Sequence, residues 1–139
     1  MTLRNALFSL GCTLALATSA MAADPLKIGL MEDVSGDLAV LGKPKLNGSL
    51  LAVEEINKAG GIMGRQIELI HLDPQGDNAR YQEFTRRLLS KDKVDLLIGG
   101  ITSASREAVR PIVDRTQTPY FYTNQYEGGV CDANMISMG

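Results

Sequence analysis

Three hydroxyl side chains follow a short apolar run in the second half of the chain. The run spans residues 94–98, two glycines close it, and Thr102, Ser103 and Ser105 come soon afterwards. Hydroxyls in such a place favour the start of a helix, where the first backbone N–H groups are free to bind a carboxylate or a carbonyl oxygen. In open α/β sheets, ligands bind at the carboxyl ends of the strands. These three residues therefore predict a small-molecule binding site, in which Ser103 offers its hydroxyl and its N–H.

A polar and aromatic segment follows the next apolar run, residues 118–122. Because crevices form where the carboxyl ends of parallel strands meet, we expect Tyr122 and Asn124 to form an amphipathic wall beside Ser103. A third loop, residues 32–42, follows the first apolar run and is expected at the same edge of the sheet.

Catalysis is the less favoured interpretation of these residues. Ser103 would need a neighbouring base to act as a nucleophile, and the only histidine, His71, lies in a strand-like run that predicts a structural role. Glu32 and Asp33 are adjacent, so their carboxylates are expected to point apart rather than to act as an acid–base pair. No spacing is typical of a metal site or a phosphate loop. We therefore expect no catalytic residue, no metal and no cofactor.

Apolar periodicity predicts the elements that position these residues. Strand-like runs alternate with helical patterns, which indicates βαβ units. The predicted strands are residues 26–31, 66–72, 94–98 and 118–122, with a possible short strand at 135–138. The predicted helices are one through residues 46–56, one from Asp77 or Asn78 to about Lys91, and one over 103–116. The expected fold class is α/β, a parallel sheet with helices on both faces, and incomplete because no closing helix follows.

The buried side of each predicted helix follows from the same spacing. The first helix is expected to bury Leu46, Leu50, Val53 and Ile56, the second Tyr81, Phe84 and Leu88, and the third Ala104, Ala108 and Ile112, with Val109 and Val113 beside them. Pro111 lies inside the third helix and predicts a kink near Glu107, since proline lacks a backbone N–H.

Residues 1–23 are expected to be a signal peptide rather than part of the fold. Arg4 precedes an apolar run over residues 6–17, which is too short to span a membrane. Ala20-Met21-Ala22 fits a signal-peptidase site, with cleavage after Ala22 or Ala23. This pattern predicts export to the periplasm.

Composition limits the partners of the remaining residues, 24–139. Without Arg4 the 14 basic residues of the chain become 13, against 16 acidic residues. This balance argues against binding to nucleic acid or to anionic membrane surfaces. Removal of the signal peptide also removes Cys12, so Cys131 is left as a lone cysteine that is either buried or paired outside this chain.

The expected mature chain carries several short motifs in a fixed order. They are Ser35-Gly36, the segments 52–57 (AVEEIN) and 59–65 (AGGIMGR), and Asp73-Pro74 followed by Gly76-Asp77. Together these motifs resemble the type I periplasmic solute-binding proteins, the leucine/isoleucine/valine-binding family of ABC importers. Segments 102–106 (TSASR) and 126–128 (YEG) are most similar to the branch that binds urea and short amides.

The resemblance implies a receptor of two lobes that traps its ligand between them. A serine at the position of Ser103 would hold the carboxylate or amide oxygen of the ligand, Tyr122 and Asn124 would complete the near wall, and Leu41 would flank the ligand. The implied ligand is an amino acid, an amide or urea, and the implied partner is the ABC permease in the membrane. Residues 24–139 would form the N-terminal part of lobe one, so the chain is expected to be a truncated member.

Two other functions remain open. One is a small exported α/β hydrolase that uses Ser103. The other is an amide-sensing regulator of the same fold, against which the signal peptide argues because such regulators act in the cytoplasm.

Overall fold

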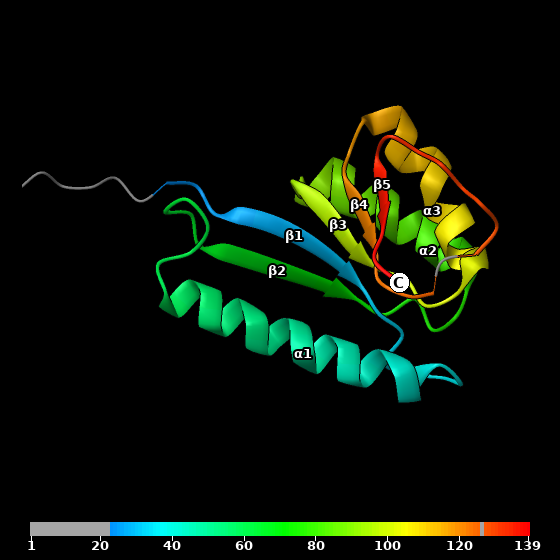
Figure 1. Cartoon of the computed structure of the whole chain (residues 1–139), viewed down its shortest axis with the longest axis horizontal. Coiled ribbons are helices and arrows are strands. Elements are labelled where there is room, and N and C mark those ends of the chain that lie inside the picture. Colours follow the sequence, from blue (N-terminus) through cyan, green and yellow to red (C-terminus); the bar gives the residue numbers. More distant parts are fainter. Residues whose placement is uncertain (1–22, 126) are drawn as a thin grey trace, which may run out of the picture.

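The chain folds into a sheet of five strands that pair only in parallel (Figure 1). The computed structural model describes residues 23–125 and 127–139, so residues 1–22 of the predicted signal peptide lie outside the described part. The strand order is β2-β1-β3-β4-β5. The strands are β1 (Leu26–Met31), β2 (Ile67–Leu72), β3 (Leu96–Gly99), β4 (Tyr120–Tyr122) and β5 (Met135–Ser137). The helices are α1 (Ala39–Lys58), α2 (Asn78–Arg87), which continues into a π-helical turn (Leu88–Asp92), and α3 (Ser103–Thr116).

The helices cover the two faces of the sheet unequally. α1 lies alone along β2 on one face, whereas α2 and α3 lie together on the other (Figure 1). Each connection from β1 to β2, β2 to β3 and β3 to β4 contains a helix, the usual crossover between parallel strands. The described residues between the parallel neighbours β4 and β5 contain no helix. The predicted α/β class, with helices on both faces of a parallel sheet, is confirmed.

The main core lies between the sheet and the α2–α3 pair. Its buried side chains are Met31, Tyr81, Leu88, Val94, Leu97, Val109, Val113, Tyr120, Tyr122 and Met135. The predicted inner side of α2 is confirmed, since Tyr81 and Leu88 are buried and Phe84 packs against them. Asp77 caps α2, because its carboxylate accepts hydrogen bonds from the backbone N–H of Ala79 and Arg80.

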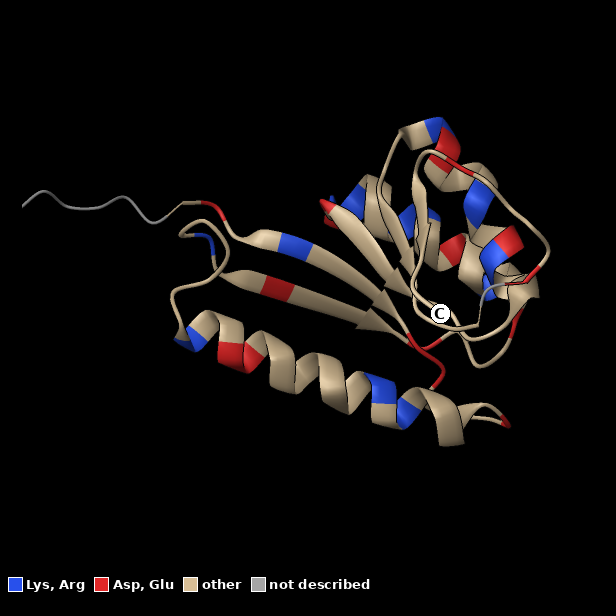
Figure 2. Ribbon diagram, in the orientation of Figure 1, with Lys and Arg blue, Asp and Glu red and all other residues tan. Residues whose placement is uncertain are grey.

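α1 differs from the prediction at its start and in what it buries. It begins at Ala39, so Leu41 and Gly42 are helical rather than part of a loop. Leu50, predicted to be core, is 50 % exposed. An apolar hollow of about 330 Å³ remains between α1 and the sheet, and residues 46–53 in the middle of α1 carry no charge (Figure 2). This face of the sheet is therefore only partly covered by the described residues.

α3 keeps the predicted bounds but buries a partly different set of side chains. Val109, Ile112 and Val113 are buried as predicted, whereas Ala104 is exposed and Ala108 is only partly buried, so the two alanines were placed wrongly. The buried side chains are Ser105, Arg106, Val109, Ile112 and Val113. The difference accompanies the burial of Arg106, whose guanidinium is paired with a carboxylate instead of facing water. α3 remains one helix across Pro111.

The possible short strand near the end of the chain is present as β5, which pairs with β4. Among the described residues, no helix is both long and apolar enough to cross a membrane.

Candidate functional site

A tight glycine turn joins β3 to α3 and shapes the candidate site. Gly99 and Gly100 have positive φ angles of 120° and 91°, which side chains other than glycine rarely adopt. A Cβ atom at Gly99 would lie 2.3 Å from the carbonyl oxygen of Met31. These two glycines therefore let the backbone pass close to the end of β1 after β3. The chain can then begin α3 at the carboxyl edge of the sheet.

Side chains from other elements hold the three carbonyl groups of this turn. The Tyr120 hydroxyl donates to the Gly99 oxygen at 3.1 Å, and the Lys45 ammonium donates to the Gly100 oxygen at 2.9 Å. The Ile101 oxygen accepts from the Tyr122 hydroxyl at 3.3 Å and from the side-chain amide of Asn124. With its carbonyl groups fixed on the protein, the turn directs the start of α3 toward the crevice.

A reciprocal pair of hydrogen bonds caps the start of α3. The Thr102 hydroxyl accepts from the backbone N–H of Ser105 at 3.0 Å, and the Ser105 hydroxyl accepts from the N–H of Thr102 at 3.2 Å. Thr102 is thus the cap, while Ser103 is the first residue of the helix. Among the described residues, no acceptor bonds the backbone N–H of Ser103 or Ala104. These two donors remain available to a ligand oxygen.

A hollow of about 240 Å³ opens beside the start of α3. It is lined by Ile101, Thr102, Ser103, Tyr122, Asn124, Gln125 and Glu127. Its size is just below the range of about 300–1,000 Å³ typical of drug-sized ligands. The Ser103 hydroxyl lies on this surface and donates a hydrogen bond of 2.8 Å to the Glu127 carboxylate.

Four of the six residues predicted to bind a ligand line this hollow, and two do not. Thr102, Ser103, Tyr122 and Asn124 lie together there. Ser105 is 1 % exposed and uses its side chain in the cap, and Leu41 lies in the first turn of α1, 50 % exposed and outside the lining. Glu127 was missed, because its contact with Ser103 joins residues 24 positions apart. The segment 126–128, noted only as a motif, was the one signal that pointed to it.

A buried cation lies behind the wall of the hollow. Arg106 is 2 % exposed, and its guanidinium lies 5.2 Å from the centre of the Tyr122 ring and 3.1 Å from a carboxylate oxygen of Glu107. The partnership with Arg110 and Arg106 lowers the pKa of the Glu107 carboxyl, although partial burial opposes this. Cation–π contact and ion pairing together hold the ring of Tyr122 in place.

A second buried charge lies at the end of β1. Glu32 is 1 % exposed, and one of its oxygens accepts from Lys45 at 2.9 Å and from the hydroxyl of Thr123 at 3.4 Å. The other oxygen has no hydrogen-bond partner among the described residues. Burial raises the pKa of Glu32 to about 7, and the neighbouring Lys45 limits that increase. Lys45 thereby ties α1 both to this carboxylate and to the glycine turn.

Asp33 points away from Glu32, as expected of adjacent residues. Its carboxylate accepts from the Tyr81 hydroxyl at 2.9 Å and from the Gly76 N–H at 2.8 Å. The lone histidine, His71, has a ring nitrogen 3.0 Å from the Glu32 carbonyl oxygen. Neither residue lines the hollow beside Ser103. In the part of the chain that the structure describes, no group of three or more His, Cys, Asp and Glu residues is placed to hold a metal ion.

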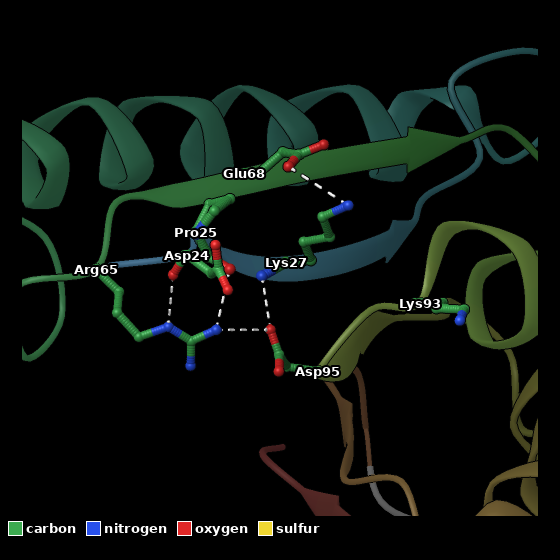
Figure 3. A pocket seen from close by; sticks show the side chains of 7 residues that line it. All are labelled: Asp24, Pro25, Lys27, Arg65, Glu68, Lys93 and Asp95. Carbon is green, nitrogen blue, oxygen red and sulfur yellow. Dashed lines mark hydrogen bonds and ion pairs between the residues drawn. The ribbon is translucent and has the colours of Figure 1, made fainter. Parts of the chain in front are cut away.

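A charged hollow lies at the opposite, amino-terminal edge of the sheet, and the contacts of its residues stabilise the fold (Figure 3). Arg65 donates to the carbonyl oxygens of Asp24 and Pro25 at 2.8 and 2.9 Å, and lies 3.3 Å from the Asp95 carboxylate. Asp95 also accepts from the backbone N–H of Lys27 at 2.8 Å. Arg65, which ends the 59–65 motif, therefore anchors the start of the described chain to β1 and β3 and takes no part in the crevice.

Comparison with known proteins places this chain in a known family. A family model described as periplasmic binding protein matches residues 25–139. The chain is similar to Leu/Ile/Val-binding protein homolog 7 of Brucella melitensis, with 35% identity over 115 residues. That match covers 83% of this chain but only 29% of the relative, so the chain spans less than a third of the length of that relative.

Solved structures agree in fold. The branched-chain amino acid transporter substrate binding protein LivJ from Streptococcus pneumoniae, in complex with isoleucine, is 33% identical with a TM-score of 0.71, over 75% of this chain and 30% of that one. A solute binding protein of an ABC transporter from Rhodopseudomonas palustris, in complex with 3,4-dihydroxybenzoic acid, is 25% identical with a TM-score of 0.62, over 71% and 26% of the two chains. Similar lobes thus occur in proteins that bind chemically different ligands.

Proposed function

This chain belongs to the periplasmic binding protein family, and on that premise we propose that it supplies part of the first lobe of a solute-binding protein for an ABC importer. Its task would be to hold one side of a small ligand at the carboxyl edge of the sheet. The family match over residues 25–139 supports this proposal. Export through the signal peptide of residues 1–23 would place the protein in the periplasm.

The observation that carries the proposal is the hollow beside the start of α3. The Ser103 hydroxyl and the Tyr122–Asn124 wall line this hollow. The backbone N–H groups of Ser103 and Ala104, which have no acceptor among the described residues, belong to the first turn of α3 beside it. Donors fixed in this way bind a ligand oxygen with little reorganisation. The proposed ligand is an amino acid of the branched-chain type, or urea or a short amide, since each offers such an oxygen.

The mechanism would be closure of two lobes around the ligand, followed by docking on the permease. Hinge closure around a bound molecule is the usual movement of periplasmic binding proteins. This chain spans 29% of its relative and would hold one side of such a site. We therefore expect weak, millimolar binding by the chain itself, since buried ligands normally lose about 70–90% of their exposed surface in a complete pocket.

Catalysis by Ser103 is less well supported than binding. A serine nucleophile needs a base that a third group orients. The Glu127 carboxylate lies within hydrogen-bonding distance of the Ser103 hydroxyl, but no third group among the described residues orients it, and the ring of His71 lies against the Glu32 carbonyl. An amide-sensing regulator would share the fold and the crevice, and would differ in location rather than in this geometry.

Backbone amide shifts measured by NMR test the proposal. We expect millimolar isoleucine or acetamide to shift the N–H signals of Ser103 and Ala104. Ser103→Ala should weaken the response, and Ser90→Ala should not, because the Ser90 hydroxyl only donates to the Arg86 carbonyl on the surface of the fold. The proposal fails if neither compound moves these signals while the spectrum shows a folded chain.

A further inference from the structure

We infer that Glu127 selects the ligand of this crevice: it favours the O=C–N–H edge of an amide and disfavours a carboxylate. The inference rests on the proposed binding function and concerns the chemical group that is held beside Ser103. It distinguishes between the amide-like and the amino-acid-like ligands that the proposal leaves open.

The geometry places an acceptor next to donors. The Glu127 carboxylate lies 2.8 Å from the Ser103 hydroxyl oxygen, and both residues line the same hollow. The N–H groups of Ser103 and Ala104, which have no acceptor among the described residues, belong to the same turn of α3. One small region of surface therefore offers N–H donors and a negatively charged acceptor to a single ligand.

An amide complements this arrangement and a carboxylate does not. The carbonyl oxygen of an amide accepts from the N–H groups of α3, and its own N–H on the adjacent atom donates to Glu127. A carboxylate has only acceptors, so its second oxygen would face the Glu127 carboxylate. Two like charges at such a distance repel each other.

Among the described residues, the neighbouring cations form their ion pairs with carboxylates other than Glu127. Arg106 is paired with Glu107 at 3.1 Å, and Lys45 is paired with Glu32 at 2.9 Å. Among the described residues, Glu127 makes no ion pair, and its recorded partner is the Ser103 hydroxyl. Its negative charge is therefore the one that a ligand at Ser103 meets.

Acetamide and acetate form an isosteric pair that tests the inference. In the full chain, titration of the Ser103 and Ala104 N–H signals should show acetamide binding at least about tenfold more tightly than acetate, the effect of one charge-assisted hydrogen bond. Glu127→Gln keeps the size of the side chain and removes the charge, so the acetamide/acetate ratio should fall to near one. Glu83→Gln makes the same change on an exposed position of α2 and should leave the ratio unchanged.

The outcomes separate the inference from the function on which it rests. If acetate or isoleucine binds the original chain as tightly as acetamide, or if Glu127→Gln leaves the ratio unchanged, the selection by Glu127 is wrong although the crevice binds ligands. If none of these compounds shifts the signals of Ser103 and Ala104, the proposed function itself is wrong.

Discussion

Ionisation of Glu32 should make the fold less stable as pH rises. The carboxyl group is 1 % exposed, and burial raises its pKa from 4.5 to about 7. The folded chain therefore holds this proton more tightly than the unfolded chain does. Below pH 4.5 the carboxyl is protonated in both states and does not lower the free energy of unfolding. Above pH 7 it is ionised in both states and lowers the free energy of unfolding by the full amount.

The magnitude follows from the pKa values. A change from 4.5 to about 7 corresponds to about 3 kcal/mol of free energy of unfolding, since a tenfold change in an equilibrium constant is about 1.4 kcal/mol. Most of this loss, about 2–3 kcal/mol, should occur between pH 5 and pH 8. Typical domains are stable by only about 5–15 kcal/mol, so the effect is large enough to measure.

Glu32→Gln isolates this contribution. Guanidinium unfolding, followed by circular dichroism because the chain has no tryptophan, gives the free energy of unfolding at each pH. The variant should gain stability relative to the original chain as pH rises from 5 to 8, by the same 2–3 kcal/mol. Asp73 and Glu107 have lowered pKa values, so their stabilising effects are lost only in more acidic solution and cancel in the comparison.

Lys45→Met provides a second and opposite perturbation. It removes the cation 2.9 Å from Glu32, which should raise the pKa of Glu32 further. Loss of one partner of a buried ion pair typically costs about 3–5 kcal/mol, and the cost here should be greatest at high pH. Parallel stability profiles for the original chain and Glu32→Gln between pH 5 and pH 8 would refute the argument.

Two further predictions concern α1 and the lone cysteine. Gly42→Ala should lower the free energy of unfolding by about 3 kcal/mol or more, because a Cβ atom would lie 1.9 Å from the Asp33 carbonyl oxygen. A Cβ atom at Gly48 would have no heavy atom within 4 Å, so Gly48→Ala should instead raise the free energy of unfolding by about 0.5–1 kcal/mol. Equal melting temperatures for the two variants would contradict the close approach at Gly42. Cys131 is free and exposed, so a thiol reagent should label the native chain as fast as the denatured one, and protection in the native state would disprove this.

Elements with a clear apolar period could be predicted from the sequence, whereas close backbone approaches could not. The order of strands and helices, the inner side of α2 and the span of α3 follow from local patterns. The start of α1 was predicted too late, because the helical spacing of apolar residues begins only at Leu46. In the structure, Gly42 is helical and lets α1 cross the backbone at Asp33, a contact between segments that spacing along the chain does not reveal.

The sequence predicted which polar residues belong to the site, but not which of them form hydrogen bonds or ion pairs with one another. Ser103 begins α3, and Tyr122 and Asn124 lie at and just after the end of β4, so the parallel sheet brings them to one edge. The links from Ser103 to Glu127 and from Glu32 to Lys45 join different loops and helices. The burial of Arg106 on α3 was missed for a similar reason, since its guanidinium contacts the Tyr122 ring and the Glu107 carboxylate.

The hydrogen bonds of the site divide its residues into two groups with different consequences. Tyr122 and Asn124 line the hollow, but their polar groups are already used on the Ile101 carbonyl. Replacing either one should therefore disturb the turn before α3 and weaken every ligand alike. Ser103 and Glu127 bond each other across the open surface, where a ligand can replace either partner without leaving a buried group unsatisfied. Discrimination between ligands should accordingly change at Ser103 and Glu127, while Tyr122 and Asn124 set how well the crevice is formed.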